Sequence, residues 1–110
     1  MIPEHVRRRF LRDPLTLRLG GLAADLARIA SCAEDPRDKA ALLSLLEEGK
    51  WFAEWAAPDA PISVQATLAE VQISLALWQR CWLADRPDPS AREQARRWSD
   101  RLLELSGLAS

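Results

Sequence analysis

The chain has 110 residues and a formal net charge of −1 at pH 7, and 48% of its residues are hydrophobic. This length allows one domain with a single core and leaves no room for a separate catalytic domain. The balanced charge argues against nucleic acid as the main partner, because phosphate binding normally needs an excess of clustered Lys and Arg. No apolar run approaches the ~20 residues that a membrane-spanning helix requires, so we expect no such helix.

The cysteines and the start of the chain bear on the cellular compartment. Residues 1–13 contain no apolar stretch of the kind found in secretory signal peptides. Two cysteines in a chain without such a signal are typical of reduced thiols, whereas a disulfide framework uses more. The sequence therefore predicts a cytoplasmic protein.

The first residues of the chain are strongly basic. The sequence predicts a flexible basic leader over 1–13 and a folded domain over 14–110. We expect the leader to fold over the rest of the chain or over a partner, and a weak contact with nucleic-acid phosphates is the alternative. The arginines available for such a contact are Arg7, Arg8, Arg9 and Arg12.

Four places in the chain combine Asp and Pro in the way that helix starts do. An Asp side chain can accept a hydrogen bond from a free amide of the first turn, and Pro at the first helical position loses no hydrogen bond. At the last place, Ser90 and Glu93 offer a competing capping box one or two residues later. The four places are Asp13-Pro14, Asp35-Pro36, Asp59-Ala60-Pro61 and Asp88-Pro89.

After each start, apolar residues recur at steps of three and four, which indicates helices with one buried stripe. Helices of about 20 residues are ~30 Å long, and the short connections cannot cross back along them, so neighbours must be antiparallel. The sequence predicts the all-α class and an antiparallel up-down-up-down four-helix bundle that ends at a left-handed cap, Gly107. The stripes include Leu15, Leu19, Leu22, Leu26 and Ile29; Leu42, Leu45 and Leu46; Val64, Leu68, Val71 and Leu75; and Ala91, Ala95, Trp98 and Leu102.

The pair Gly20-Gly21 lies inside the first of these helices. Each glycine costs a helix roughly 1 kcal/mol relative to Ala, so a compensating contact is expected. We predict that a neighbouring helix approaches closely at this pair.

Three stretches of the chain carry a resemblance to known sequences. They are PLTLRLG at 14–20, LLEE at 45–48 followed by Phe52, Glu54 and Trp55, and ARRWS at 95–99 followed by LSGL at 105–108. These stretches are similar to those of a family of short cyanobacterial proteins of no known activity. The resemblance covers nearly all of the chain after residue 13 and implies an all-helical protein from the cytoplasm of a photosynthetic bacterium. It brings no activity, cofactor or site residue with it.

The predicted helix over 62–83 has a second apolar side, well away from its core stripe. Glu70 and Arg80 are its only charged residues. A helix that is apolar on two sides needs two partners, so this second side packs under the leader, joins a second subunit or is simply exposed. We predict a homodimer through this helix, since small oligomers are most often two-fold symmetric. The second side consists of Ile62, Ala66, Ala69, Ile73, Ala76 and Leu77.

Polar and aromatic residues on the same helix raise a further alternative. Gln65, Gln72 and Gln79 recur every seven residues on the flank between the two apolar sides. Such a row either hydrogen-bonds across helices and sets their register or lines a ligand site. A small apolar ligand, a pigment or a lipid, held between helices at Trp78, Gln79 and Trp82 is the alternative function.

Trp51 and Trp55 are expected to lie beside the core stripe of their helix. Because amphipathic Trp at a rim is enriched in binding hot spots, we predict that these two residues contact an unidentified protein partner.

The sequence gives no positive sign of catalysis or of a bound cofactor. The Glu-x-x-His pattern of di-metal helix bundles is absent, and the one histidine, His5, lies in the leader, where no rigid scaffold would hold a general base. We therefore expect no enzyme activity, no cofactor and no metal, and a function exerted through protein contacts.

Overall fold

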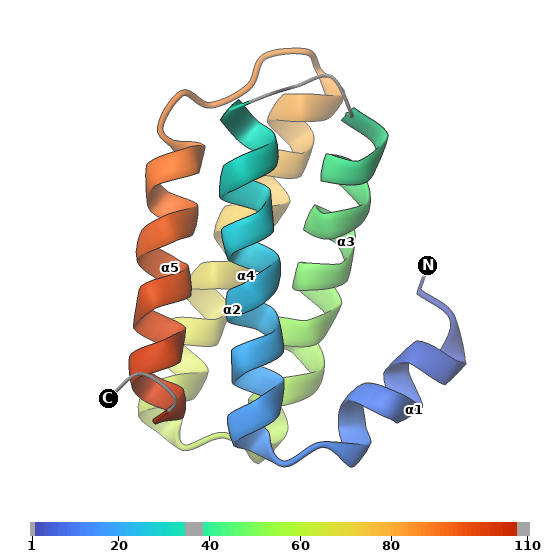
Figure 1. Ribbon diagram of the computed structural model, residues 1–110, viewed down its shortest axis with the longest axis vertical. Coiled ribbons are helices and arrows are strands. Elements are labelled where there is room, and N and C mark those ends of the chain that lie inside the picture. Colours follow the sequence, from blue (N-terminus) through green and yellow to red (C-terminus); the bar gives the residue numbers. More distant parts are fainter. Residues whose placement is uncertain (1, 35–38, 108–110) are drawn as a thin grey trace.

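The computed structural model describes residues 2–34 and 39–107, and the elements it contains there are all helical (Figure 1). The predicted all-α class is confirmed, but the described residues form five α-helices where the sequence led us to expect four. The elements are α1 (Glu4–Arg12), α2 (Leu15–Glu34), α3 (Lys39–Ala56), the 3-10 turn η2 (Ala57–Asp59), α4 (Ile62–Leu83) and α5 (Ala91–Ser106).

The Asp and Pro signals mark helix starts as predicted. Helix α2 begins directly after Pro14, whose carbonyl accepts the amides of Leu17 at 3.0 Å and Arg18 at 3.1 Å. Helix α4 likewise begins directly after Pro61. Pro61 is the N-cap residue of α4, one position before the predicted first helical position, and no side chain caps the first turn, so the expected cap bond from Asp59 does not form. The predicted start at Asp35-Pro36 lies outside the described residues.

Helix α5 starts at the later of its two candidate positions. Asp88 Oδ1 accepts hydrogen bonds from the Ser90 hydroxyl at 2.7 Å and the Ser90 amide at 2.8 Å, and these bonds lower the pKa of Asp88. The Ser90 side chain makes no cap bond to the first turn, so the expected capping box with Glu93 does not form. At the other end, Gly107 closes α5 in the left-handed conformation (φ 79°), as predicted.

Helices α2 to α5 run alternately up and down (Figure 1). Extensive packing joins α2 to α5, α2 to α3 and α3 to α4, whereas α4 and α5 barely touch although they follow one another in the chain. The described part of the molecule measures 36 × 31 × 20 Å. Since a helix with its side chains is about 10 Å across, the shortest dimension corresponds to two layers of helices. Because α4 and α5 barely touch, the arrangement is open between these two helices.

The core confirms the predicted stripes except at Leu15, Leu45 and Trp98, which are partly buried and pack against its edge. Leucines dominate it, as in Leu22, Leu26, Leu46 and Leu75, each fully buried. Helices α2, α3, α4 and α5 all contribute, and the other members follow the predicted steps of three and four residues. They include Leu19, Ile29, Leu42, Val64, Leu68, Val71, Ala91, Ala95 and Leu102.

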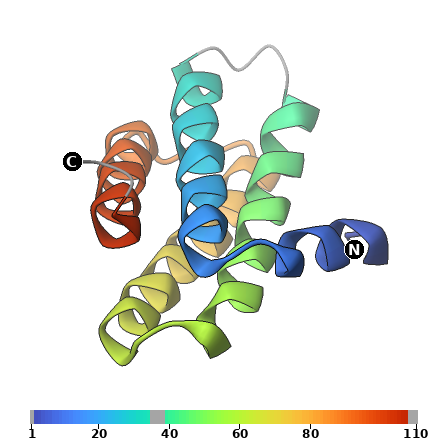
Figure 2. The ribbon, with the colours of Figure 1, turned by 60° about the horizontal axis from the view of Figure 1, so that its bottom comes forward.

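The expectation of a flexible leader over 1–13 does not hold for the residues that form α1. Phe10 is buried, and its ring stacks on that of Phe52 with centroids 4.2 Å apart and planes 12° apart. Helix α1 therefore packs against α3 and projects to one side of the molecule (Figure 2). The physical reason is that one aromatic anchor orders a segment that is otherwise charged.

A buried arginine holds the junction between α1 and α2 in place. Arg18 Nε donates to the carbonyl of Asp13 at 3.0 Å, and Arg18 Nη1 pairs with Asp59 Oδ2 of η2 at 2.9 Å. The Arg18 side chain is only 8% exposed. Asp59, expected to cap the start of a helix, instead neutralises this buried cation.

The predicted close approach at Gly20-Gly21 is not seen at Gly21, because a Cβ there would meet nothing within 4 Å. The close approach occurs at Gly49 of α3 instead, where a Cβ would lie 3.0 Å from Leu75 Cδ1 of α4. Gly49 therefore sets how closely α3 and α4 pack.

Candidate functional site

The second apolar side of α4 is exposed. We call it the outer face of α4, and it comprises the six predicted residues Ile62, Ala66, Ala69, Ile73, Ala76 and Leu77. Its three large side chains are 84%, 61% and 54% exposed at Ile62, Ile73 and Leu77. The first two alanines are exposed and Ala76 is half-buried. Helix α1 packs against α3 and leaves this face open, so the leader is not its cover.

The opposite side of α4 lies in the core. Val64, Leu68, Val71 and Leu75 are buried there, and Trp78 and Trp82 continue the same stripe. The outer face is thus not needed for the fold of the described chain. Large apolar side chains that a monomer leaves in water are the feature that distinguishes interaction surfaces from the ordinary scatter of exposed apolar atoms.

The glutamine row sets the register between α4 and the preceding segment. Gln65 Nε2 donates to the Ala57 carbonyl at 2.8 Å, and Gln79 Nε2 donates to Glu47 Oε2 at 2.8 Å. Between them, Gln72 Nε2 donates to Glu54 Oε2 at 2.7 Å and lies 3.4 Å from the Lys50 carbonyl. The cross-helix interpretation of the row is therefore confirmed.

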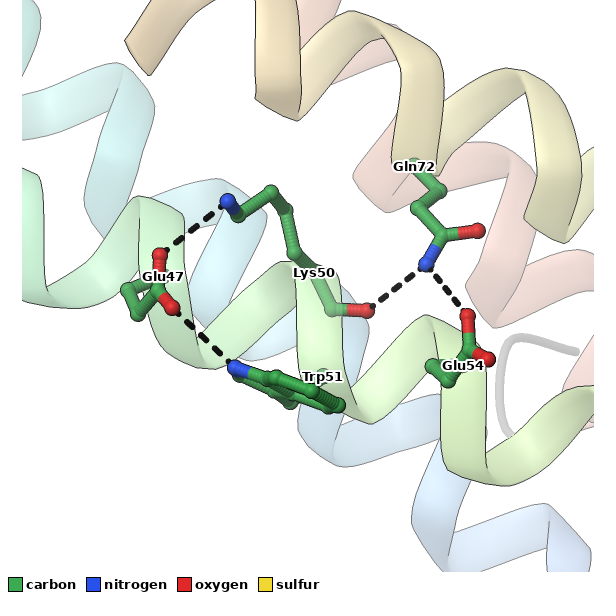
Figure 3. A pocket seen from close by; sticks show the side chains of 5 residues that line it. All are labelled: Glu47, Lys50, Trp51, Glu54 and Gln72. Carbon is green, nitrogen blue, oxygen red and sulfur yellow. Dashed lines mark hydrogen bonds and ion pairs between the residues drawn. The ribbon is translucent and has the colours of Figure 1, made fainter. Parts of the chain in front are cut away.

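Glu47 is the centre of a polar cluster on the surface of α3 (Figure 3). Its carboxylate accepts bonds from Gln79 and from Trp51 Nε1 at 3.1 Å, and Lys50 Nζ lies 3.1 Å away. The bond from Gln79, followed by the bonds from Lys50 and Trp51, lowers the pKa of Glu47 to about 2. The cluster lines a hollow of about 250 Å³ together with Glu54 and Gln72. Because these polar groups already bond to one another, few remain free for a ligand.

The structure separates the surroundings of Trp51 and Trp55. Trp51 is half-buried and is held by its bond to Glu47. Trp55 lies against the aromatic anchor of α1, with its ring 5.9 Å from Phe10 and 6.0 Å from Phe52. The indoles of the two tryptophans are 5.8 Å apart. The predicted partner-binding rim is therefore partly occupied by the chain's own α1, a contact that the sequence pattern did not indicate.

The three residues expected to hold an apolar ligand have other partners. Trp78 and Trp82 are 2% and 8% exposed and belong to the core, and the Gln79 amide is bonded to Glu47. The hollows described for this structure are lined by neither indole. Within the described part of the chain, these three residues thus serve the packing of α4 and its register with α3.

The leader arginines all lie on α1 and are exposed. Arg7 pairs with Glu4 one turn earlier, at 3.2 Å. Arg8 and Arg12 share the side of α1 opposite Phe10, because residues four apart lie on one helix face. Arg9 projects in another direction, so the four cations do not form a single patch.

Asp25 is a chemically unusual residue that no sequence pattern indicated. It is 2% exposed, its Oδ1 accepts a bond from Arg28 at 3.1 Å, and no donor reaches its Oδ2. The neighbouring acidic side chain is Glu48 of α3, and two carboxyl groups can share a hydrogen bond only when one is protonated. Burial, then this bond and the charge of Glu48, raise the pKa of Asp25 to about 8 against the opposing effect of Arg28. The sequence hints at the burial of Asp25 only through the apolar residues on either side of it.

The open side between α4 and α5 contains a hollow of about 500 Å³. Its lining joins Ser74 of α4 to Trp98 of α5 and to two arginines, Arg97 and Arg101. Both arginines form ion pairs on their own helix, with Glu93 at 2.8 Å and Glu104 at 3.3 Å. Ser74 is the residue of α4 in this lining, and no residue of the outer face belongs to it.

Within residues 2–34 and 39–107, no group of three or more His, Cys, Asp or Glu side chains could hold a metal ion. Each helix of the described chain is too short or too polar to cross a lipid bilayer. Comparison with known proteins finds no match, whether to a family, to a curated protein or to a solved structure.

Proposed function

We propose that the protein acts without catalysis, through contacts with other proteins, and that a second copy of the chain binds the outer face of α4. The observation that carries the proposal is the exposure of Ile62, Ile73 and Leu77 on a helix whose other side already fills the core. In this proposal the four long helices act as an up-down-up-down bundle that is open between α4 and α5, with α1 added at one end.

The composition of the outer face suits another helix as its cover. Ala66 and Ala69 are exposed between the large side chains, and residues of this size let two helices approach to the usual 8–10 Å. A face that binds a copy of itself is the commonest arrangement in small homo-oligomers. These properties support a symmetric pair of chains joined through α4.

The matched pair Leu77→Asp and Leu17→Asp tests the proposal. The two leucines are similarly exposed, 54% and 51%, but Leu17 lies on α2, away from the outer face. We expect light scattering on a sizing column, at two or more concentrations, to give twice the chain mass for the natural protein and for Leu17→Asp. Leu77→Asp should give the mass of one chain, because burying a carboxylate in an apolar interface is strongly unfavourable.

Circular dichroism should show the same helix content for both variants. The proposal is wrong if the natural protein has the mass of one chain at every concentration, or if the two variants have equal masses.

A further inference from the structure

Two residues of the outer face and the two charged residues of α4 follow a coiled-coil spacing. Glu70, Ile73, Leu77 and Arg80 follow one another at steps of three, four and three, which is the alternation of a and d positions along one seam of a helix. All four side chains are exposed. The seam therefore places one acidic group, two large apolar groups and one basic group in a line.

Reversing the direction of this seam exchanges its acidic and basic ends and keeps the two apolar residues in the middle. Leu75 is the midpoint between Glu70 and Arg80 and also the midpoint between Ile73 and Leu77. A two-fold axis perpendicular to α4 at the level of Leu75 would bring Glu70 opposite Arg80 of the second copy. The same axis would bring Ile73 opposite Leu77 of the second copy, and each a position would meet a d position, as in antiparallel coiled coils.

The two charges are available for such a pairing. Glu70 and Arg80 are the only charged residues of α4, and neither forms an ion pair or side-chain hydrogen bond with another residue in the described part of the chain. Other exposed charges nearby differ in this respect, since Arg97 and Arg101 of α5 are paired within their own helix.

We propose that the second copy binds with its α4 antiparallel to the first, in the register that pairs each Glu70 with Arg80 of the other copy. The proposal rests on the proposed function, because it specifies the geometry of that same contact. The apolar pairs lie at the centre and the two ion pairs close the ends. Ala66 then lies opposite the small residue Ala84, and Ile62 lies beyond the paired part of the helix.

The charges disfavour the alternative arrangements. A parallel pair of α4 helices would place Glu70 against Glu70 and Arg80 against Arg80, and like charges across an interface oppose association. A shift of the antiparallel register by one heptad would place each charge opposite an apolar or small residue. The charge pattern therefore selects one orientation and one register.

Charge reversal at the two positions tests the register. In a dimer of the Glu70→Arg variant, the new arginine of each copy faces Arg80 of the other copy, so both ends carry two positive charges. In a dimer of the Arg80→Glu variant, both ends carry two negative charges. We expect each variant to self-associate at least about tenfold more weakly than the natural protein. Mixing the two variants restores opposite charges at both ends, and so does the double variant Glu70→Arg/Arg80→Glu. Both should dimerise within about threefold of the natural protein, an effect well below the cost of one repulsive pair.

The readout is fluorescence energy transfer between differently labelled copies, with helix content checked by circular dichroism. Arg9→Glu on α1 is the matched control, since it reverses an exposed charge away from α4 and should change nothing. If Glu70→Arg and Arg80→Glu each self-associate as strongly as the natural protein, but bind each other more tightly than the natural protein binds itself, the helices are parallel and the register is wrong. If every charge variant dimerises normally while Leu77→Asp does not, the register fails and the proposed function stands. A natural protein that stays monomeric contradicts both.

Discussion

At the scale of single residues, Asp25 stands out among residues 2–34 and 39–107 because its environment opposes its ordinary ionised state. It lies between α2 and α3 with Arg28 on one side and Glu48 on the other. Because its pKa rises from 3.8 to about 8 on folding, the folded chain keeps a proton that the unfolded chain releases over this range. The contribution of Asp25 to stability is therefore most favourable at low pH and falls as the pH rises through about 8.

Asp25→Asn should remove this pH dependence. An asparagine can donate to Glu48 and accept from Arg28 without titrating. We expect the variant to be more stable than the natural protein by about 1–3 kcal/mol at pH 9 and to differ little from it at pH 4. Urea unfolding at a series of pH values measures this, with the exposed Asp13→Asn as control. Parallel stability curves for Asp25→Asn and the natural protein would refute the expectation.

At the scale of helices, Gly21 and Gly49 show that glycine can lie either in open space or against a neighbouring helix. Both lie inside helices, where alanine has the higher intrinsic propensity. Space is free around Gly21, whereas Leu75 occupies the space around Gly49. Of these two glycines, Gly49 is therefore the one with a packing reason to be glycine.

Alanine at the two positions should separate these effects. We expect Gly21→Ala to stabilise the protein by about 0.5–1 kcal/mol, from helix propensity alone. Gly49→Ala gains the same propensity but pushes Leu75 out of place, so it should be less stable than Gly21→Ala by about 1 kcal/mol or more. Urea unfolding compares the two directly. Equal stabilisation by both variants would show that α3 and α4 can move apart without cost.

The long helices could be predicted because their signals are local. Pro14, Pro61 and Gly107 act through their own backbone angles, and the core stripes follow helical spacing. Helix α1 could not be predicted in this way. Its order depends on Phe10 meeting Phe52, residues far apart in the chain, and mostly charged neighbours conceal that single anchor.

The candidate site was predicted to a similar extent. The apolar residues of the outer face were found from periodicity, since helical spacing alone separates them from the core stripe. The surroundings of Trp55 could not be found from periodicity, because α1 partly covers this residue. The carboxyl pair of Asp25 and Glu48 was also missed, because it joins two helices whose relative rotation no local pattern specifies.

At the scale of the whole molecule, α5 depends on α2 for most of its packing, since it barely touches α4. One buried polar bond contributes to this contact, from Ser99 Oγ to the Ala23 carbonyl at 2.7 Å. A helix attached along one side can open while the remaining helices stay packed. Opening of α5 would uncover the flank of α2 and change the hollow between α4 and α5.

Ser99→Ala should make this opening measurable. Loss of the bond costs about 1 kcal/mol, which corresponds to roughly fivefold faster hydrogen exchange for the amides that α5 protects by opening as a unit. Amides in the middle of α3 and α4 should change less. Ser44→Ala, at an exposed serine of α3, is the control and should leave exchange unaltered. Equal acceleration across all helices would mean that the molecule opens only as a whole.

The pairing of α2 with α5 also bears on how the chain is made. Helix α2 is complete at Glu34, but the helix that covers its flank begins only at Ala91 and ends at Ser106. At translation rates of about 5–20 residues per second, several seconds separate the synthesis of the two surfaces. During that interval Ala23 and the other α2 residues that face α5 are uncovered on the nascent chain. This flank is therefore where the chain under synthesis most needs protection from contact with other molecules.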